Sequence, residues 1–98
     1  MTVVFTRTVT PNSGHLSATL KFVRKRIAAL EKAYGLKISL NARFGGPAGQ
    51  LIMVSYHKDM AALAKVRRKV MKGVISGKIP QPKPGLVKEV EDAVWTRL

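Results

Sequence analysis

The sequence predicts an α+β fold in which two helices pack on one face of an antiparallel β-sheet. Three observations lead to this fold class. Residues 2–10 form a β-branched, alternating run, and two later segments carry apolar residues at helical spacing. Between those segments, residues 37–57 read KISLNARF, GGPAG and QLIMVSYH, which is typical of a hairpin. The chain of 98 residues has 46% hydrophobic residues, which predicts one domain spanning residues 1–98.

The first strand is expected over residues 2–10 and is ended by the turn residues PNSG. Asn12 or Ser13 can cap the helix that follows, which should run from about His15 to Tyr34 and stop at Gly35. A regular apolar stripe predicts that this helix packs on the sheet, with a coiled-coil seam as the alternative. The stripe consists of Leu16, Leu20, Val23, Ile27, Leu30 and Tyr34.

The register of the hairpin decides which side chains face the helices. If Phe44 pairs with Gln50, the turn is Gly45 to Gly49. The face under the helices then carries Ile38, Leu40, Ala42, Phe44, Ile52, Val54 and Tyr56. The opposite face is mixed and carries Lys37, Ser39, Asn41, Arg43, Leu51, Met53, Ser55 and His57. A mixed face of this kind suggests that the sheet has a partner.

The second helix is expected over about residues 60–71, with Asp59 as its N-cap and an extension past Gly73 as an open question. Arg67 lies near its apolar stripe. Its guanidinium either reaches solvent along the edge of the helix or points into a ligand cavity. The prolines of IPQPKP then impose a loop. The tail, residues 86–98, suits either a helix or a turn and strand.

A right-handed crossover places the first strand parallel to one hairpin strand, with both helices on one face. If the tail adds a fourth strand, the order βαββαβ gives a ferredoxin-like arrangement. The mixed face of the hairpin would then pack against a second copy of the sheet, which predicts a homodimer.

The hairpin with SYHKDMAALAKVRRKV behind it, together with the ending GLVKEVEDAVWTRL, resembles the dimeric α+β barrel superfamily. That superfamily includes antibiotic-biosynthesis-type monooxygenases and NIPSNAP-like proteins. The resemblance implies that the tail is a strand, that two protomers pack through their sheets, and that a cofactor-free monooxygenase or isomerase activity is one candidate function. The haem-degrading branch has an Asn on its first strand, and this chain has none there. Asn41, His57 and Trp95 are therefore not interpreted as its triad.

The net charge of +13 predicts a positive field that would attract nucleic acid or another polyanion. The alternative interpretation is that the Lys and Arg side chains only keep the helix surfaces solvated. The basic residues outside the apolar stripes would form one plate across both helices and bind without sequence preference. The candidates are Lys21, Arg24, Lys25, Lys32, Lys65, Arg68, Lys69 and Lys72. A structural dimer that binds another protein is a third interpretation.

The favoured hypothesis is a homodimer that binds a small anionic or aromatic molecule, either inside a barrel or between the sheet and the helices. The residues expected to border that cavity are Arg7, Asn41, Arg43, Met53, His57, Arg67 and Trp95. No catalytic residue is assigned, because no pair of carboxylates has the setting of an acid and a base. The absence of Cys and the separation of His15 from His57 predict no metal site, and no cofactor is expected. Without a signal peptide or a long apolar run, a cytoplasmic location and no membrane association are expected.

Overall fold

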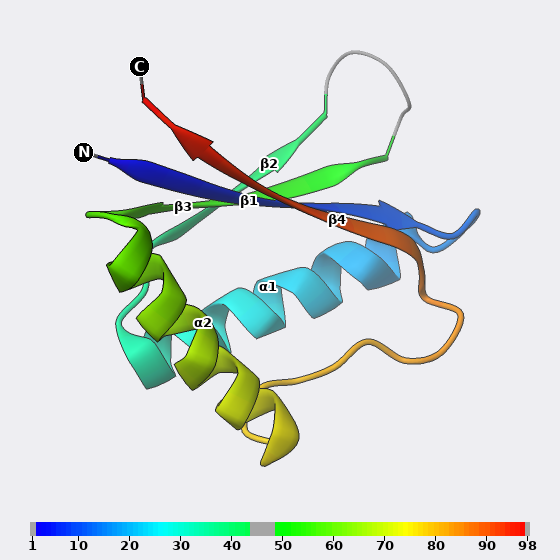
Figure 1. Cartoon of the computed structure of the whole chain (residues 1–98). Coiled ribbons are helices and arrows are strands. Elements are labelled where there is room, and N and C mark those ends of the chain that lie inside the picture. Colours follow the sequence, from blue (N-terminus) through cyan, green and yellow to red (C-terminus); the bar gives the residue numbers. More distant parts are fainter. Residues whose placement is uncertain (1, 44–48, 98) are drawn as a thin grey trace.

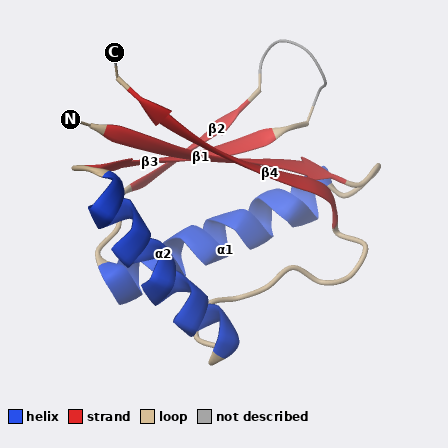
Figure 2. Ribbon diagram, viewed as in Figure 1, coloured by secondary structure: helices blue, strands red, loops and turns tan. Residues whose placement is uncertain are grey.

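The computed structural model describes residues 2–43 and 49–97 and has the order βαββαβ (Figure 1). The elements are β1 (Val3–Pro11), α1 (Leu16–Tyr34), β2 (Ile38–Ala42), β3 (Leu51–His57), α2 (Met60–Ile75) and β4 (Val87–Thr96). The four strands form one sheet in the order β2-β3-β1-β4. Both helices lie on the same side of this sheet (Figure 2). The predicted α+β fold is confirmed, and the tail, which the residues alone left open, is a strand.

Each neighbouring pair of strands in the sheet is antiparallel. Because β1 and β2 both run antiparallel to β3, they are parallel to each other, as the crossover rule predicted. The tail strand β4 pairs with β1 along almost its whole length, from Val3 opposite Thr96 to Pro11 opposite Val87. This arrangement is ferredoxin-like.

Helix α1 begins at Leu16, and the predicted side-chain cap is wrong. His15 occupies the N-cap position and its side chain makes no capping hydrogen bond. The Asn12 side chain instead donates from Nδ2 to the Gly85 carbonyl at 2.6 Å, in the loop before β4. The predicted end is confirmed, because Gly35 has φ 65° and its N–H donates to the Glu31 carbonyl.

Helix α2 begins as predicted, with the Asp59 carboxylate accepting a hydrogen bond from the Ala62 N–H at 2.8 Å. The helix is longer than the predicted segment and runs through Gly73 to Ile75. Gly73 is buried, and a Cβ there would collide with the Tyr34 hydroxyl and lie 2.9 Å from Ile79 Cγ1. Glycine therefore lets α2 pack closely against α1 and the loop that follows α2.

The predicted register of the hairpin is wrong by one residue. Ala42 pairs with Leu51, and the Arg43 N–H donates to the Gln50 carbonyl at 2.8 Å. Gln50 therefore lies opposite Arg43, where Phe44 was expected; Phe44 itself and residues 45–48 lie outside the described residues. The shift exchanges the two faces of β3.

With this register, the core lies between the helices and the side of the sheet that carries Leu51 and Met53. Val3 and Val9 of β1 share that side, and all four side chains are buried. Val23, Ile27 and Leu30 of α1 and Leu63 of α2 cover them, and Ile79 is buried as well. The more polar face of β3 was predicted to lie away from the helices, against a second sheet, but its residues Leu51, Met53 and Ser55 are buried on the helix side.

The other side of the sheet faces away from both helices (Figure 2), and we call it the open face. Strand alternation and the register place thirteen side chains of all four strands on it. They are Val4, Thr6, Thr8, Thr10, Ser39, Asn41, Ile52, Val54, Tyr56, Glu89, Glu91, Ala93 and Trp95. Tyr56 and Trp95 are 68% and 60% exposed, so large aromatic side chains lie uncovered on this face.

Candidate functional site

A cavity of about 190 Å³ lies between the sheet and the two helices. Strands β1, β2 and β3 supply its floor, and α1 and α2 supply its walls. Most of the lining is apolar, with five polar or charged exceptions that include three arginines. The full lining is Phe5, Arg7, Arg26, Leu30, Leu36, Ile38, Met53, Ser55, His57, Leu63, Val66, Arg67, Val70, Met71 and Val74. Apolar walls with a few convergent polar groups are typical of small-molecule sites.

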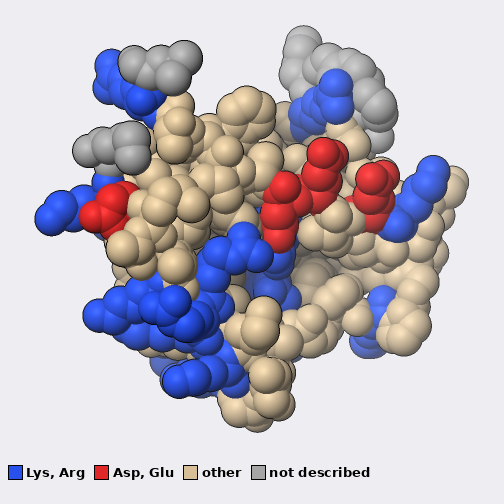
Figure 3. All heavy atoms as spheres, in the orientation of Figure 1, with Lys and Arg blue, Asp and Glu red and all other residues tan. Residues whose placement is uncertain are grey.

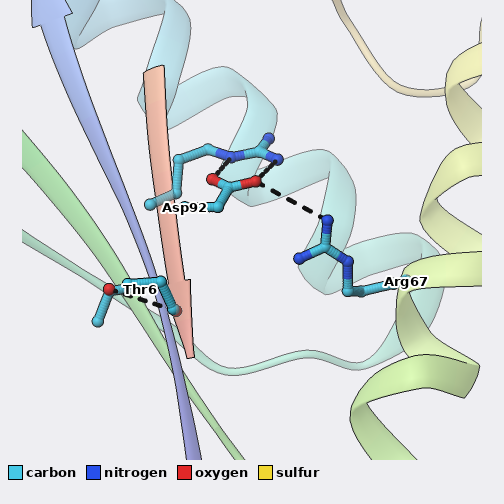
Figure 4. Close-up of polar contacts among 5 residues, drawn as sticks. Thr6, Arg67 and Asp92 are labelled. Carbon is cyan, nitrogen blue, oxygen red and sulfur yellow. Dashed lines mark hydrogen bonds and ion pairs between the residues drawn. The ribbon is translucent and has the colours of Figure 1, made fainter. Parts of the chain in front are cut away.

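One carboxylate lies beside the arginines of this cavity (Figure 4). Asp92 of β4 accepts hydrogen bonds from Arg7 Nε at 2.7 Å and Arg7 Nη2 at 2.9 Å. Arg7 and Asp92 are cross-strand partners, which brings the two side chains close enough for this bidentate pairing. These hydrogen bonds hold the pKa of Asp92 below its usual value and raise the pKa of Arg7.

Arg67 reaches the same carboxylate from α2, with 3.8 Å between its Nη2 and Asp92 Oδ2. This distance is an ion pair and is too long for a hydrogen bond. The Arg67 guanidinium also lies 5.0 Å from the centre of the Phe5 ring, which is a cation–π distance. Its side chain is 48% exposed, so Arg67 stands at the mouth of the cavity.

Arg26 of α1 is the third arginine, and it is only 8% exposed. Its Nη1 donates to the Pro80 carbonyl at 3.0 Å, in the loop after α2. Burial is the main cause that lowers the pKa of Arg26, and the positive charge of Arg7 lowers it further. A guanidinium remains charged at neutral pH in such a setting. The charge of Arg26 is therefore held inside the wall of the cavity.

The same cavity holds a hydroxyl–imidazole pair on β3. Ser55 and His57 lie two residues apart on the helix side of the strand, with 2.9 Å between Ser55 Oγ and His57 Nε2. Ser55 is buried, and burial lowers the pKa of His57. The imidazole is therefore mostly neutral at pH 7 and can accept a proton or a hydrogen bond.

Of the seven residues predicted to border a cavity, four line this one: Arg7, Met53, His57 and Arg67. Arg67 borders the cavity, and its side chain is also 48% exposed. The other three, Asn41, Arg43 and Trp95, do not line the cavity. Asn41 and Trp95 are on the open face, where the Trp95 Nε1–H donates to Thr6 Oγ1 at 3.1 Å. Arg43 lies at the end of β2 and bonds the Gln50 side chain at 2.6 Å. One site that combines all seven residues is not formed within the chain.

Sequence reasoning missed four contributors to the site: Phe5, Arg26, Ser55 and Asp92. Phe5 and Asp92 could have been found from the pairing of β1 with the tail, because both belong to that strand pair. Ser55 was placed on the correct strand but on the wrong side of the sheet. Arg26 carried no signal that separated it from Arg24, the other arginine of its helix.

Among the residues that the structure describes, no group of three or more His, Cys, Asp or Glu side chains could hold a metal ion. Within the same residues, no helix combines the length and apolarity required to cross a bilayer.

The eight basic residues predicted to form a plate are all exposed. Four belong to α1 and four to α2, and both helices lie on the same side of the sheet. Figure 3 shows Lys and Arg side chains gathered over α2 and acidic side chains along β4. The described ion pairs involve only Asp92 with Arg7 and Arg67, so none of these eight has an ion-pair partner within residues 2–43 and 49–97.

No family model matches the chain, and no curated protein matches it in sequence. Solved structures match its fold. A NIPSNAP family protein of Agrobacterium tumefaciens has a TM-score of 0.75 and 20% identity, with 100% of this chain and 94% of that chain covered. An uncharacterised NIPSNAP domain protein of Burkholderia xenovorans has a TM-score of 0.80 and 11% identity, covering 98% and 94%. Rv0793 of Mycobacterium tuberculosis has a TM-score of 0.64 and 18% identity, covering 100% and 96%. The chain shares the ferredoxin-like α+β fold of these proteins.

Proposed function

We propose that the cavity between the sheet and the helices binds a small anionic molecule. The observation that carries this proposal is the imbalance of charge at the cavity. Three guanidinium groups line it, from Arg7, Arg26 and Arg67, and Asp92 is the one carboxylate paired with them among the described residues. An anion would offset this excess of positive charge in a partly desolvated space, where electrostatic interactions are stronger than in water.

Arg67 is the best placed of the three to bind the anion. Arg7 already uses its Nε and Nη2 on Asp92, and Arg26 uses its Nη1 on Pro80. The guanidinium of Arg67 makes no hydrogen bond to the described residues, and it stands at the mouth. It has five N–H donors in a planar fork that suits a carboxylate.

Calorimetric titration with benzoate and with the neutral benzamide tests this proposal. We expect benzoate to bind and benzamide to bind at least tenfold more weakly, because a hydrogen bond to a charged group contributes more than a neutral one. R67Q should weaken benzoate binding by about 10- to 100-fold. K65Q removes the same charge from the outer side of α2 and should change little. Equal effects of R67Q and K65Q, or equal binding of benzoate and benzamide, would contradict the proposal.

We also propose that the open face packs against a second copy of the chain, as in the dimeric α+β barrel superfamily. The exposed rings of Tyr56 and Trp95 support this, because uncovered aromatic side chains on a sheet favour a partner. The shared fold with NIPSNAP proteins supports membership of that superfamily. An isomerase reaction, or a monooxygenase-like reaction with O2 as the oxidant, would need a base in the cavity to remove a substrate proton, and the neutral imidazole of His57 is suited to accept it.

Binding of nucleic acid or another polyanion is the second candidate function. The observation that favours it is the exposure of eight basic side chains on α1 and α2 without acidic partners in the described part of the chain. Mobility-shift titrations with DNA and RNA at 50 and 200 mM salt test it. Binding through these residues should weaken steeply with salt and be lost in a K65Q/R68Q/K69Q/K72Q variant. Failure to bind at 50 mM salt would exclude this function.

A further inference from the structure

The arginines of the cavity gather at one side of the sheet. The Asp92 carboxylate on β4 pairs with Arg7 of β1 and with Arg67 of α2 (Figure 4). The Arg67 guanidinium also lies 5.0 Å from the centre of the Phe5 ring on β1. Burial lowers the pKa of Arg26, and the charges of Arg7 and Asp92 act on it as well, so the third guanidinium lies in the same region. The positive charge is therefore held over β1 and β4, at one side of the strand order β2-β3-β1-β4.

The other side of the cavity, over β2, is apolar. Phe5 of β1 pairs with Ser55 of β3, and Ser55 pairs in turn with Ile38 of β2. Two strand spacings of about 4.8 Å place the backbone of Ile38 roughly 10 Å from that of Phe5. Leu36, two residues before Ile38, also lines the cavity. The cavity therefore runs across the strands, from the guanidinium groups over β1 to aliphatic side chains at the start of β2.

The polar pair between these two sides is already satisfied. Ser55 Oγ and His57 Nε2 lie 2.9 Å apart and bond each other. No buried side-chain nitrogen or oxygen atom of residues 2–43 and 49–97 lacks a hydrogen-bond partner. A ligand that lies over β3 therefore needs no polar group there, because an apolar group leaves no buried donor or acceptor unpaired.

The lining favours an aliphatic chain over an aromatic ring. Phe5 is the one Phe, Tyr or Trp among the described residues that line the cavity, and the Arg67 guanidinium already lies over its ring. The other apolar lining residues are aliphatic or Met, and Met side chains adapt to irregular shapes. The cavity has a volume of about 190 Å³. Since an apolar cavity of about 150 Å³ holds the six carbon atoms of benzene, this volume suits a chain of about six to eight carbon atoms.

We propose that the ligand is an unbranched aliphatic monocarboxylate of about six to eight carbon atoms, which is a medium-chain fatty acid. Its carboxylate binds Arg67 over β1, its chain crosses β3, and its methyl end contacts Ile38 and Leu36. This inference rests on the proposed binding of a small anion in the same cavity. It adds the chemical class of the ligand and the direction in which the ligand lies.

Calorimetric titration at neutral pH with acetate, butanoate, hexanoate, octanoate and decanoate tests the inference. We expect the affinity to rise about three- to fourfold with each added methylene as far as octanoate, because each methylene moves from water into the apolar cavity. Decanoate should gain less than about twofold per methylene, since its end no longer fits inside. Octanoate should bind more tightly than benzoate. Octanamide, which has the same chain without the charge, should bind at least about tenfold more weakly than octanoate.

Two variants locate the two ends of the ligand. R67Q should weaken every acid of the series by the same factor, because all of them share the carboxylate. I38F fills the apolar end, so it should weaken octanoate about tenfold more than butanoate, the loss of roughly two buried methylenes. I75F makes the same substitution at an 80% exposed position of α2 and should leave the whole series unchanged.

NMR spectroscopy of the wild-type protein gives the direction of the ligand without any substitution. Nuclear Overhauser effects should join the terminal methyl group of octanoate to Ile38 and Leu36. The methylene next to the carboxylate should show them to the Phe5 ring instead. Contacts of the terminal methyl group with Phe5, and none with Ile38, would overturn the inference.

The outcomes also distinguish this inference from the proposed function. If acetate and octanoate bind equally and R67Q weakens both, the inference of a chain is overturned and anion binding stands. If benzoate binds more tightly than octanoate, the chain is again overturned and anion binding stands. If octanamide binds as tightly as octanoate, or if no carboxylate binds, both the inference and the proposed function are overturned.

Discussion

Asp92 of β4 accepts two hydrogen bonds from the guanidinium of Arg7, its cross-strand partner on β1, at 2.7 and 2.9 Å. The two side chains are 29% and 28% exposed, so water screens this pair only in part. Arg67 shares the same carboxylate at 3.8 Å. Asp92 therefore fixes the position of Arg7 and offsets part of the charge of Arg67 at the mouth of the cavity.

Replacing Asp92 with Asn should lower stability and strengthen anion binding. The variant keeps the shape of the side chain but leaves Arg7 without its carboxylate, so we expect the free energy of unfolding at pH 7 to fall by about 1–2 kcal/mol. Anion affinity should rise severalfold, because one competing negative charge is gone. Urea denaturation and calorimetric titration with benzoate measure the two effects. E89Q removes a carboxylate from the same strand outside the cavity and is the matched control.

The stability effect of D92N should depend on pH. The pKa of Asp92 is lowered in the folded chain, mainly by the Arg7 hydrogen bonds, so its contribution is fully present above the ordinary carboxyl pKa of about 3.9. The contribution is lost as the pH falls from there through the folded pKa. The difference between wild type and D92N should therefore shrink below about pH 4. A difference that grows on acidification would contradict this assignment.

Two helix boundaries that local chemistry determines were predicted from the sequence, although the side-chain cap of α1 was not. Asp59 caps α2 and Gly35 ends α1 as expected, because each acts through its own backbone neighbourhood. The register depended on the length of a glycine-rich turn, which residue types do not fix, and a one-residue error exchanged the faces of β3. Leu51 and Met53 are buried, and so they belong to the covered face.

The site was predicted only in part, because a cavity is formed by tertiary packing. Arg24 and Arg26 lie at roughly equal angles, about 80°, on either side of the apolar stripe of α1, and helical periodicity does not distinguish them. In the structure Arg26 is buried beside Pro80, whereas Arg24 is exposed. The contact between Arg7 and Asp92 could not be predicted either, because it depends on the pairing of β4 with β1. That pairing joins residues 85 positions apart in the sequence.

Gly73→Ala should destabilise the fold by about 1–3 kcal/mol, the usual cost of overpacking. The added Cβ would collide with the Tyr34 hydroxyl and crowd Ile79. Urea denaturation of G73A, Y34F and the double variant measures the coupling. Removing the hydroxyl relieves one of the two clashes, so G73A should cost less in the Y34F background. Equal costs in both backgrounds would show that Tyr34 is not the obstacle.

Asp59→Ala should lower the free energy of unfolding by about 1 kcal/mol, because it removes the acceptor for the Ala62 N–H at the start of α2. Asp59→Ser should recover most of this loss, since a serine hydroxyl also caps well. Chemical denaturation followed by circular dichroism measures both variants. If serine were no better than alanine, the contribution of Asp59 would not come from capping.

Stability should also fall on mild acidification because of His57. Burial lowers its folded pKa below the ordinary value of about 6.5, so the unfolded chain binds more protons in that range. The contribution is fully present above about pH 6.5 and is lost as the pH falls through the folded pKa. H57Q should lack this dependence. NMR titration of the His57 ring gives an independent measure, and a midpoint at or above 6.5 would contradict the prediction.

Val54→Lys should separate the proposed dimer into monomers without unfolding the chain. Val54 lies on the open face of β3, between Thr6 of β1 and Ser39 of β2, so a lysine there meets water in a monomer. Under a second sheet its charge would be buried without a partner, which is costly.

Analytical ultracentrifugation should give wild type twice the chain mass of 10.7 kDa and V54K the mass of one chain, with unchanged circular dichroism. A28K adds the same charge on the exposed side of α1 and should stay dimeric. A wild-type protein that is monomeric at micromolar concentration would show that the open face does not pair with a second copy.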